Sequence, residues 1–482
     1  AHPTVRRIAA LLREQGAAGE PVELPETAPT ATAAAAQLGC TVGAIANSLL
    51  APWSGPYGGV PPFAAARVEH FQPALETAMA EKLAEIAALA ENPEPATFAN
   101  TIAALEGAGR AMDRVRTIYE VFSGTMSSPE VQAVEREMAP KLAALADRIF
   151  QNEKLFARIE AVYGTRESSG LTPEQQRLVW LDYTNFVRAG AKLDGPAKKR
   201  LSEITQFSQN VLADETDYVL VLDSEADLAG LPPSLRAAAS AAAESRGHAG
   251  KWAILNTRSS MEPFLTYSDR RDLREKVWRT YFSRGDNGDA RDNNASITEI
   301  LLLRGERAKL IGYPTHAHRR LENSMAKTPE RTLELMEAVW KPAVARVHEE
   351  VADMQKIAGA EVTIEPWDYR YYAEKVRKER YDLDENEVKP YLQLEKLREG
   401  MFWVAGELLG LRFTPVADVP VYHPDVRVWK VTNAASELVG LWYFDPYARP
   451  GKRSGAWMNA YRSQERFERE IRTIVSNNSN FV

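Results

Sequence analysis

The chain has 482 residues, of which 45% are hydrophobic and 26% charged, and its formal net charge is −7 at pH 7. This length predicts two or three folding units. Interspersed acidic and basic residues leave no broad basic face for nucleic acid, and no apolar run reaches the roughly 18 residues of a membrane span. One cysteine, Cys40, excludes an intramolecular disulfide framework. With no signal-peptide pattern at the first residues, this predicts a cytoplasmic protein.

The first 50 residues differ from the rest of the chain. A short helix over 5–14, a strand over 21–25 and an alanine-rich helix over 30–38 predict a small β/α segment that is too short to hold its own core. The following stretch, 51–62, is dense in glycine and proline, and it predicts a loop or linker.

Helical periodicity dominates the rest of the chain, because apolar residues recur at spacings of three and four. The predicted long helical stretches are 73–91, 97–122, 131–162, 173–212 and 329–358. Residues typical of strands gather at 218–222 and in a cluster between 412 and 458. The pattern therefore predicts a mainly α fold with a small sheet near the C-terminal end and a short β/α segment at the start.

The histidines do not form a metal-ligating pattern. His348 begins like a zinc helix, but the residue four positions on is Ala352, so we predict a solvated helix face. His316 and His318, two residues apart, project about 200° apart on a helix, which favours a capping or packing role. His423 precedes a proline and is predicted to start a turn, with a structural role favoured over acid–base catalysis. No catalytic and no metal-ligating residue is predicted.

Several long blocks resemble the thimet-oligopeptidase family of zinc metallopeptidases, most closely its bacterial dipeptidyl carboxypeptidases (peptidyl-dipeptidases). The blocks are MAKTP (325–329), PWDYRYYAEKVR (366–377), YDLDE (381–385), KPY (389–391), PVYHPDVRVW (420–429) and SGAWM (454–458). They occur in the order of that family, and the resemblance runs from about Asn47 to the end of the chain.

The resemblance implies a mainly helical, two-lobed molecule with a deep channel that removes dipeptides from the C-terminus of oligopeptides. It also implies zinc, held by the two histidines of a His-Glu-x-x-His motif and a further glutamate, with the motif glutamate as general base. No such motif occurs in these 482 residues, so no bound zinc is expected here. The block around Gly455, Ala456, Trp457 and Met458 resembles the strand along which the substrate backbone lies.

Residues 1–46 instead resemble the opening of prolyl-tRNA editing deacylases. That family has a Lys-Ser-Leu motif where this chain has Asn47-Ser48-Leu49, so no editing activity is expected. The predicted domains are accordingly a deacylase-like segment (1–46), an N-terminal helical region (47–325) and a helical and sheet region forming part of the substrate cleft (326–482).

Three hypotheses follow. The first is a truncated or chimeric peptidyl-dipeptidase relative that is inactive as this chain alone. The second is a complete enzyme whose zinc-bearing segment comes from a second chain. The third is a non-catalytic module that binds peptides or self-associates. The expected partners are short oligopeptides and either the missing catalytic segment or a second copy, with no nucleic acid and no membrane.

Overall fold

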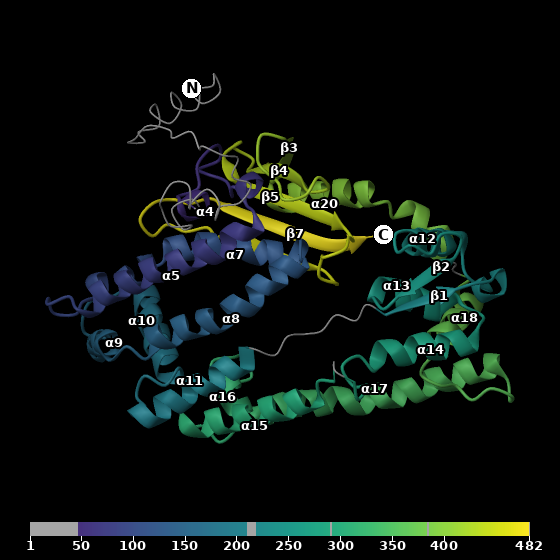
Figure 1. Ribbon diagram of the computed structural model, residues 1–482, viewed down its shortest axis with the longest axis horizontal. Helices are drawn as coiled ribbons and strands as arrows, with labels where there is room; N and C mark the ends of the chain where they lie inside the picture. Colours follow the sequence, from purple (N-terminus) through teal and green to yellow (C-terminus); the bar gives the residue numbers. More distant parts are fainter. Residues whose placement is uncertain (1–46, 210–217, 290–291, 383–384, 482) are drawn as a thin grey trace, which may run out of the picture. The chain divides into compact units, whose positions relative to one another are not determined.

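The computed structural model describes residues 47–209, 218–289, 292–382 and 385–481 (Figure 1). The predicted β/α segment over 1–46, its deacylase-like resemblance and Cys40 lie outside these residues. The described chain is mainly helical with small sheets, so the predicted fold class is confirmed.

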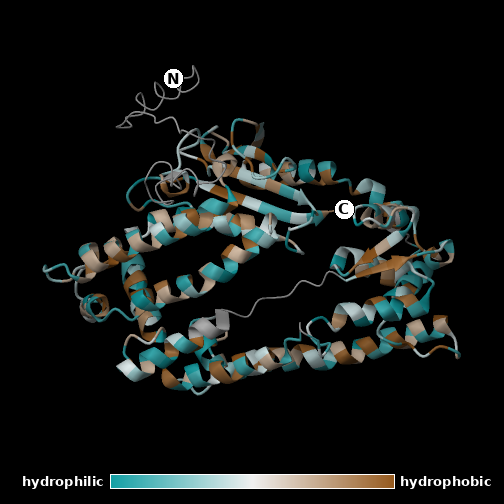
Figure 2. Ribbon diagram, in the orientation of Figure 1, coloured by the Kyte–Doolittle hydropathy of each residue, from teal (hydrophilic) through white to brown (hydrophobic). Residues whose placement is uncertain are grey.

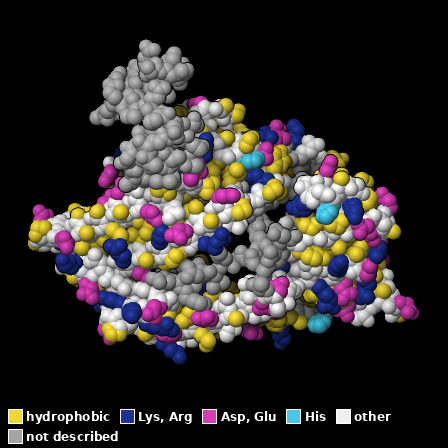
Figure 3. All heavy atoms as spheres, viewed as in Figure 1, with side chains coloured by type: hydrophobic (Ala, Val, Ile, Leu, Met, Phe, Trp, Pro, Cys, Tyr) yellow, Lys and Arg dark blue, Asp and Glu magenta, His cyan; other side chains and the backbone are white. Residues whose placement is uncertain are grey.

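The chain forms two compact units. Of the described residues, unit 1 contains those from 47 to 183 and returns at 417–424, whereas unit 2 contains those within 184–416 and 425–481. The domain boundaries expected after residues 46 and 325 stay predictions. Figure 3 shows acidic and basic side chains interspersed over the visible face, as their mixing along the sequence predicts.

Unit 1 is a helical array in which α5 packs against α7 and α8. Its elements are α4 (Asn47–Leu50), η1 (Phe63–Ala65), α5 (Val68–Ala90), the π-helical turn η2 (Phe98–Ala103), α6 (Ala104–Gly107), α7 (Arg110–Thr125), α8 (Pro129–Phe150), α9 (Glu153–Thr165) and most of α10 (Pro173–Arg188). Phe71, Leu75 and Ile118 are fully buried in this array. The returning segment packs on it, with the Tyr422 ring 5.1 Å from that of Phe63.

Three helical stretches predicted as continuous are each divided in the structure. Gly109 has a φ of 88° and separates α6 from α7, a conformation that favours glycine. The Asn152 side chain accepts a hydrogen bond from the Leu155 N–H at 3.0 Å and so caps a new helix, α9. Gly190, with a φ of 94°, follows the end of α10. The sequence did not predict these breaks, because apolar residues keep the same three- and four-residue spacing on both sides of each break.

Unit 2 contains the remaining helices and two sheets. The helices are α11 (Gly195–Gln209), η3 (Glu225–Leu228), α12 (Pro233–Glu244), α13 (Arg258–Tyr267), α14 (Arg271–Phe282), α15 (Asn294–Leu310), α16 (His316–Leu321), α17 (Pro329–Ala358), α18 (Tyr369–Tyr381), α19 (Glu385–Val388), η4 (Lys389–Tyr391) and α20 (Leu394–Leu409). The smaller sheet pairs β1 (Val219–Leu222) with β2 (Trp252–Leu255), and Figure 2 shows both strands as hydrophobic. β1 confirms the predicted strand, whereas β2 was not predicted.

The larger sheet has five strands in the order β3-β4-β5-β7-β6. They are β3 (Arg412–Val416), β4 (Arg427–Thr432), β5 (Leu438–Tyr447), β6 (Trp457–Arg462) and β7 (Thr473–Phe481). β5 and β7 run parallel, and the other neighbours are antiparallel. The sheet predicted between 412 and 458 is confirmed. β7 was missed because its sequence, TIVSNNSNF, is rich in residues typical of turns.

A buried ion pair joins α14 to the start of α18. The Asp368 carboxylate is fully buried and accepts a hydrogen bond from Arg274 at 2.7 Å. Arg274, 2% exposed, also donates to the main-chain oxygens of Ser268 at 2.7 Å and Trp367 at 3.3 Å. Arg271 adds a second guanidinium at 2.8 Å. The block PWDYRYYAEKVR therefore contains a structural carboxylate.

Two long helices of unit 2 leave apolar side chains exposed. α17 has Met354 as its single fully buried residue, and α20 has none. The exposed apolar residues of these helices are Leu333, Leu335, Met336, Val339, Trp340 and Val347 on α17, and Leu397, Met401, Trp403, Val404, Leu408 and Leu409 on α20. Among the described helices, none combines the length and the apolar character needed to cross a membrane.

Candidate functional site

The edge of the five-stranded sheet carries the residues predicted to bind substrate. Gly455 and Ala456 precede β6, and Trp457 and Met458 are its first two residues. β6 pairs with β7 on one side, and within the described part of the chain no strand pairs with its other side. An edge strand presents main-chain N–H and C=O groups that an extended peptide can pair with. Met458 is 67% exposed at this edge.

The turn before β6 is held by side-chain hydrogen bonds to its backbone. Asn480 in β7 donates to the main-chain oxygen of Gly455 at 2.7 Å and to that of Arg453 at 2.9 Å. Gly455 has a φ of 93°, which favours glycine. Trp457 lies opposite Asn478 of β7 in the strand register. The edge is therefore fixed by the neighbouring strand before any ligand binds.

A buried charge cluster anchors the loop between β5 and β6. Asp445, near the end of β5, accepts hydrogen bonds from Arg449 at 2.7 Å and from Lys452 at 2.9 Å. The Asp445 and Lys452 side chains are both fully buried. Burial alone raises the pKa of Asp445, but the hydrogen bonds from Arg449 and Lys452 outweigh burial and lower it. The carboxylate thus stays ionised and holds the first part of the loop against the end of β5.

A pocket of about 720 Å³ adjoins this loop within unit 2. Its lining combines the loop with the small helical subregion around β2; the polar residues include Arg246, Asn256, Thr257, Ser259, Ser454 and Asn480, and the apolar ones Ala238, Ala242 and Leu255. Mixed apolar and hydrogen-bonding walls next to the loop that precedes β6 suit the side chains of an extended peptide.

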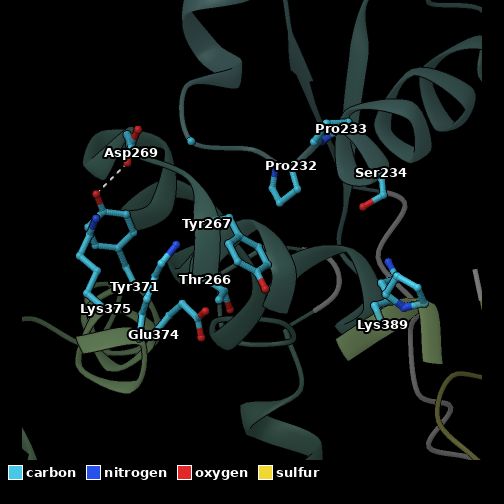
Figure 4. A pocket seen from close by; sticks show the side chains of 13 residues that line it. Pro232, Pro233, Ser234, Thr266, Tyr267, Asp269, Tyr371, Glu374, Lys375 and Lys389 are labelled. Carbon is cyan, nitrogen blue, oxygen red and sulfur yellow. Dashed lines mark hydrogen bonds between the residues drawn. The ribbon is translucent and has the colours of Figure 1, made fainter. Parts of the chain in front are cut away.

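A second pocket, of about 740 Å³, lies between α13, α18 and the start of α12 (Figure 4). Tyr371 points to Asp269 and donates to it at 2.7 Å, and the Lys375 ammonium lies 4.4 Å from the Tyr371 ring centroid. Burial, followed by the bond to Asp269, raises the pKa of Tyr371 to about 12. At neutral pH this phenol is a hydrogen-bond donor and not a base, so the pocket can bind a ligand but offers no general base in Tyr371.

The histidines discussed above do not come together. His348 lies on an exposed face of α17, as predicted. His318 Nδ1 lies 2.8 Å from the hydroxyl of Thr315, the residue that caps the N-terminus of α16, so this ring has a local structural contact. His423 lies in the returning segment of unit 1, directly before a turn at Pro424. Among the described residues, no group of three or more His, Cys, Asp or Glu side chains is arranged to hold a metal ion.

The sequence reasoning missed the residues that shape the edge, namely Asp445, Arg449, Lys452 and Asn480. One signal was present. Asp445 is an acidic residue within LVGLWYFDPY, a strand that is otherwise largely apolar. A carboxylate in such a run is stable only when a cation is buried with it, and Arg449 and Lys452 follow within seven residues.

Asp182 on α10 is a half-buried residue of unit 1 whose Oδ2 atom is buried and has no hydrogen-bond partner among the described residues. Burial, with a smaller contribution from Glu106, raises the pKa of Asp182 to about 7. Because the folded-state pKa is raised, ionisation disfavours folding progressively as the pH rises from about 4 to 7. We expect Asp182→Asn to stabilise unit 1 near pH 8 by up to about 4 kcal/mol, and by almost nothing below about pH 4.

Denaturant unfolding followed over this pH range measures the effect. Asp113→Asn, at an exposed position on α7, is the matched control, and its effect should stay below about 1 kcal/mol. A stabilisation by Asp182→Asn that does not change with pH would contradict the assigned pKa.

Comparisons with known proteins place this geometry in context. The sequence profile of peptidase family M3 matches residues 264–480. The dipeptidyl carboxypeptidase of Escherichia coli is 38% identical over 407 residues, which cover 82% of this chain and 60% of that protein. The dipeptidyl carboxypeptidase of Salmonella typhimurium is 36% identical over 86% of this chain and 62% of its own length.

Oligopeptidase A of Salmonella typhimurium is more distant, at 31% identity over 428 residues, with 86% of this chain and 62% of that protein covered. The chain thus spans about three fifths of the length of these curated relatives. The matched family region contains β6 and the loop before it.

Proposed function

Because the chain belongs to peptidase family M3, we propose that it supplies the helical region and the substrate-binding sheet edge of a peptidase that removes dipeptides from the C-terminus of oligopeptides. The observation that carries this proposal is the 38% identity to a dipeptidyl carboxypeptidase, against 31% to an oligopeptidase A. The predicted relation to the thimet-oligopeptidase family is thereby confirmed. One cysteine in 482 residues supports a reducing compartment, the cytoplasm, as its location.

In this proposal the peptide backbone pairs with β6. The open edge of Trp457–Arg462 offers the main-chain groups, and Asn480 fixes the turn at Gly455 where the strand begins. Main-chain pairing recognises an extended peptide largely independently of its sequence. Gly455, Ala456, Trp457 and Met458 are the proposed contact residues.

Peptidases of family M3 are zinc-dependent, but the described residues do not fit a zinc site. They hold no suitable group of ligands, and His-Glu-x-x-His occurs nowhere in the 482 residues. We therefore propose that the zinc ligands come from a further polypeptide segment, either of a longer protein or of a second chain. No chemical step is assigned to residues of this chain.

The exposed apolar faces of α17 and α20 support a missing partner. Trp340 and Trp403 are each 67% exposed, and Leu408 is 76% exposed. Exposed apolar surface of this extent marks an interaction surface. About two fifths of the length of the Escherichia coli relative lies outside the region that this chain matches, so the proposed occupant is the zinc-bearing segment of the family. A second copy of this chain is the competing occupant.

Peptide binding tests the strand edge directly. A fluorescent peptide of about eight residues should bind the purified chain, and two versions of it, N-methylated at alternate residues in opposite registers, should differ by at least about tenfold in affinity. Only one register places N–H groups toward β6, so methylation in the other register serves as the control. Equal affinities for the two methylated peptides would contradict pairing along β6.

Dipeptide release tests the origin of the zinc ligands. The chain with added zinc is expected to release no dipeptide, whereas a mixture with a zinc-bearing segment of a family relative is expected to release dipeptides in a chelator-sensitive way. Trp340→Glu and Trp403→Glu should weaken that complementation, because each places a charge on the proposed interface. Chelator-sensitive release by the chain alone would overturn the proposal, and light scattering that shows a stable dimer would favour the second copy.

A further inference from the structure

Four arginines line a small pocket of about 300 Å³ formed by the end of α10 with α15 and α16 in unit 2. The lining residues are Asn185, Arg188, Ala189, Arg307, Arg319, Arg320 and Asn323. We propose that this arginine pocket binds a phosphate-type oxyanion, a site distinct from the sheet edge and independent of the proposed peptidase function.

The pocket concentrates positive charge without matching negative charge in its lining. None of its described lining residues is acidic. Arg188, whose side chain is 10% exposed, reaches Glu322 at 3.9 Å, which is the outer limit of an ion pair. Glu322 also accepts a hydrogen bond from the Tyr313 hydroxyl at 2.5 Å, so its charge is shared. The guanidinium of Arg188 donates to the main-chain oxygen of Arg319 and so holds the wall of the pocket in place.

Arg319 is the arginine of this pocket whose charge is least compensated by its surroundings. Its Nε is buried and has no hydrogen-bond partner in the part of the chain that the structure describes. Burial, then the charges of Arg307, Arg188 and Arg320, lowers the pKa of Arg319 to about 10. Burial, and then the charge of Arg319, also lower the pKa of His316, at the start of α16. The buried Nδ1 of His316 has no hydrogen-bond partner among the described residues. A bound anion offsets this repulsion, and its oxygens are acceptors for the Arg319 guanidinium.

The chemistry of the lining selects the anion. Guanidinium groups form paired N–H donors that match the oxygens of phosphate, and the amides of Asn185 and Asn323 can add further donors. A pocket of about 300 Å³ is less than half the volume of either pocket described above, so it suits a small group and not a peptide. Inorganic phosphate and a phosphate group on a larger molecule share this chemistry.

Calorimetric titration of the full chain with inorganic phosphate tests the site, at constant ionic strength set with chloride. Binding to the unaltered chain should saturate at one ion per chain and raise the unfolding temperature. Arg319→Met should weaken binding at least about tenfold, and Arg320→Met, at an exposed position, should weaken it several-fold with the fold intact. Arg148→Met, on an exposed face of α8 in unit 1, should bind as the unaltered chain does.

Titrations with other anions show which class of ligand the pocket binds. Phenyl phosphate that binds as well as inorganic phosphate indicates a site open to phosphorylated molecules, and exclusive binding of the free ion indicates a closed one; both support the proposal. Acetate or citrate that binds more tightly than phosphate would overturn it in favour of a carboxylate site. Chloride that gives the same stabilisation, or unchanged phosphate affinity in both Arg319→Met and Arg320→Met, would overturn it outright.

Discussion

Replacing Asp368 with alanine is expected to lower the free energy of unfolding of unit 2 by about 3 to 5 kcal/mol. The substitution leaves the Arg274 guanidinium, 2% exposed, without its carboxylate at 2.7 Å. Arg274 would keep its bonds to the main-chain oxygens of Ser268 and Trp367, but these neutral acceptors do not balance a buried charge. The loss should appear in denaturant unfolding followed by circular dichroism and tryptophan fluorescence.

Two matched substitutions separate burial from pairing. Arg271 is 45% exposed and bonds to the same carboxylate, so Arg271→Ala should cost about 1 kcal/mol or less. Asp272→Ala removes an exposed carboxylate that pairs with Arg270, and its effect should be equally small. If all three variants lose similar stability, the buried pair is not the cause.

The pH dependence gives an independent check. Burial alone raises the pKa of Asp368, but the hydrogen bonds from Arg271 and Arg274 outweigh it and hold the pKa below its usual value. A lowered folded-state pKa gives stability that is present above about pH 4 and is lost as the pH falls through the folded-state pKa. Asp368→Ala should therefore reduce the loss of stability on acidification in that range, compared with the unaltered chain.

Local sequence pattern predicted much of the fold, because helices depend on contacts between neighbours in the chain. The stretch 329–358 became α17 with the predicted bounds. Where the pattern failed, one residue changed the backbone without changing the apolar spacing, as Gly109 and Asn152 did. The sequence did not predict β7 for a different reason. Its Ser476 and Asn478 are buried in a sheet and bond to each other at 3.2 Å, a tertiary arrangement that overrides their turn propensity.

The candidate sites were less predictable, since they depend on residues far apart in the sequence. The resemblance pointed to Gly455–Met458, but the edge position of β6 arises because β7, later in the chain, inserts between β5 and β6. Asp368 and its partner Arg274 are 94 residues apart in the sequence, and Arg188 and Arg319, which are joined by a hydrogen bond, are 131 residues apart. No local pattern reports such pairs, so neither the structural carboxylate nor the arginine pocket was predicted.

Asp445→Ala is the second substitution expected to have a large effect. It should lower the free energy of unfolding of unit 2 by about 3 to 5 kcal/mol, because it leaves two buried cations without their carboxylate in the loop before β6. Lys452 is fully buried and Arg449 is 9% exposed, so neither can readily turn to water. Lys452 also donates to the main-chain oxygens of Asp445 and Tyr447, at 2.9 and 2.8 Å. Loss of the carboxylate should therefore loosen the loop as well as destabilise the sheet, and peptide affinity should fall together with stability.

A triple substitution distinguishes the destabilisation caused by unpaired buried charges from the contribution of the cluster's hydrogen bonds to stability and to peptide affinity. Asp445→Leu combined with Arg449→Met and Lys452→Met removes all three charges while keeping similar volumes, so its stability should recover toward that of the unaltered chain. Peptide affinity should not recover to the same extent, because Lys452 no longer holds the Tyr447 carbonyl and the loop that leads to Gly455. Recovery of both quantities would show that the cluster acts on stability alone, and recovery of neither would show that its hydrogen bonds, and not its charge balance, hold the edge of the sheet.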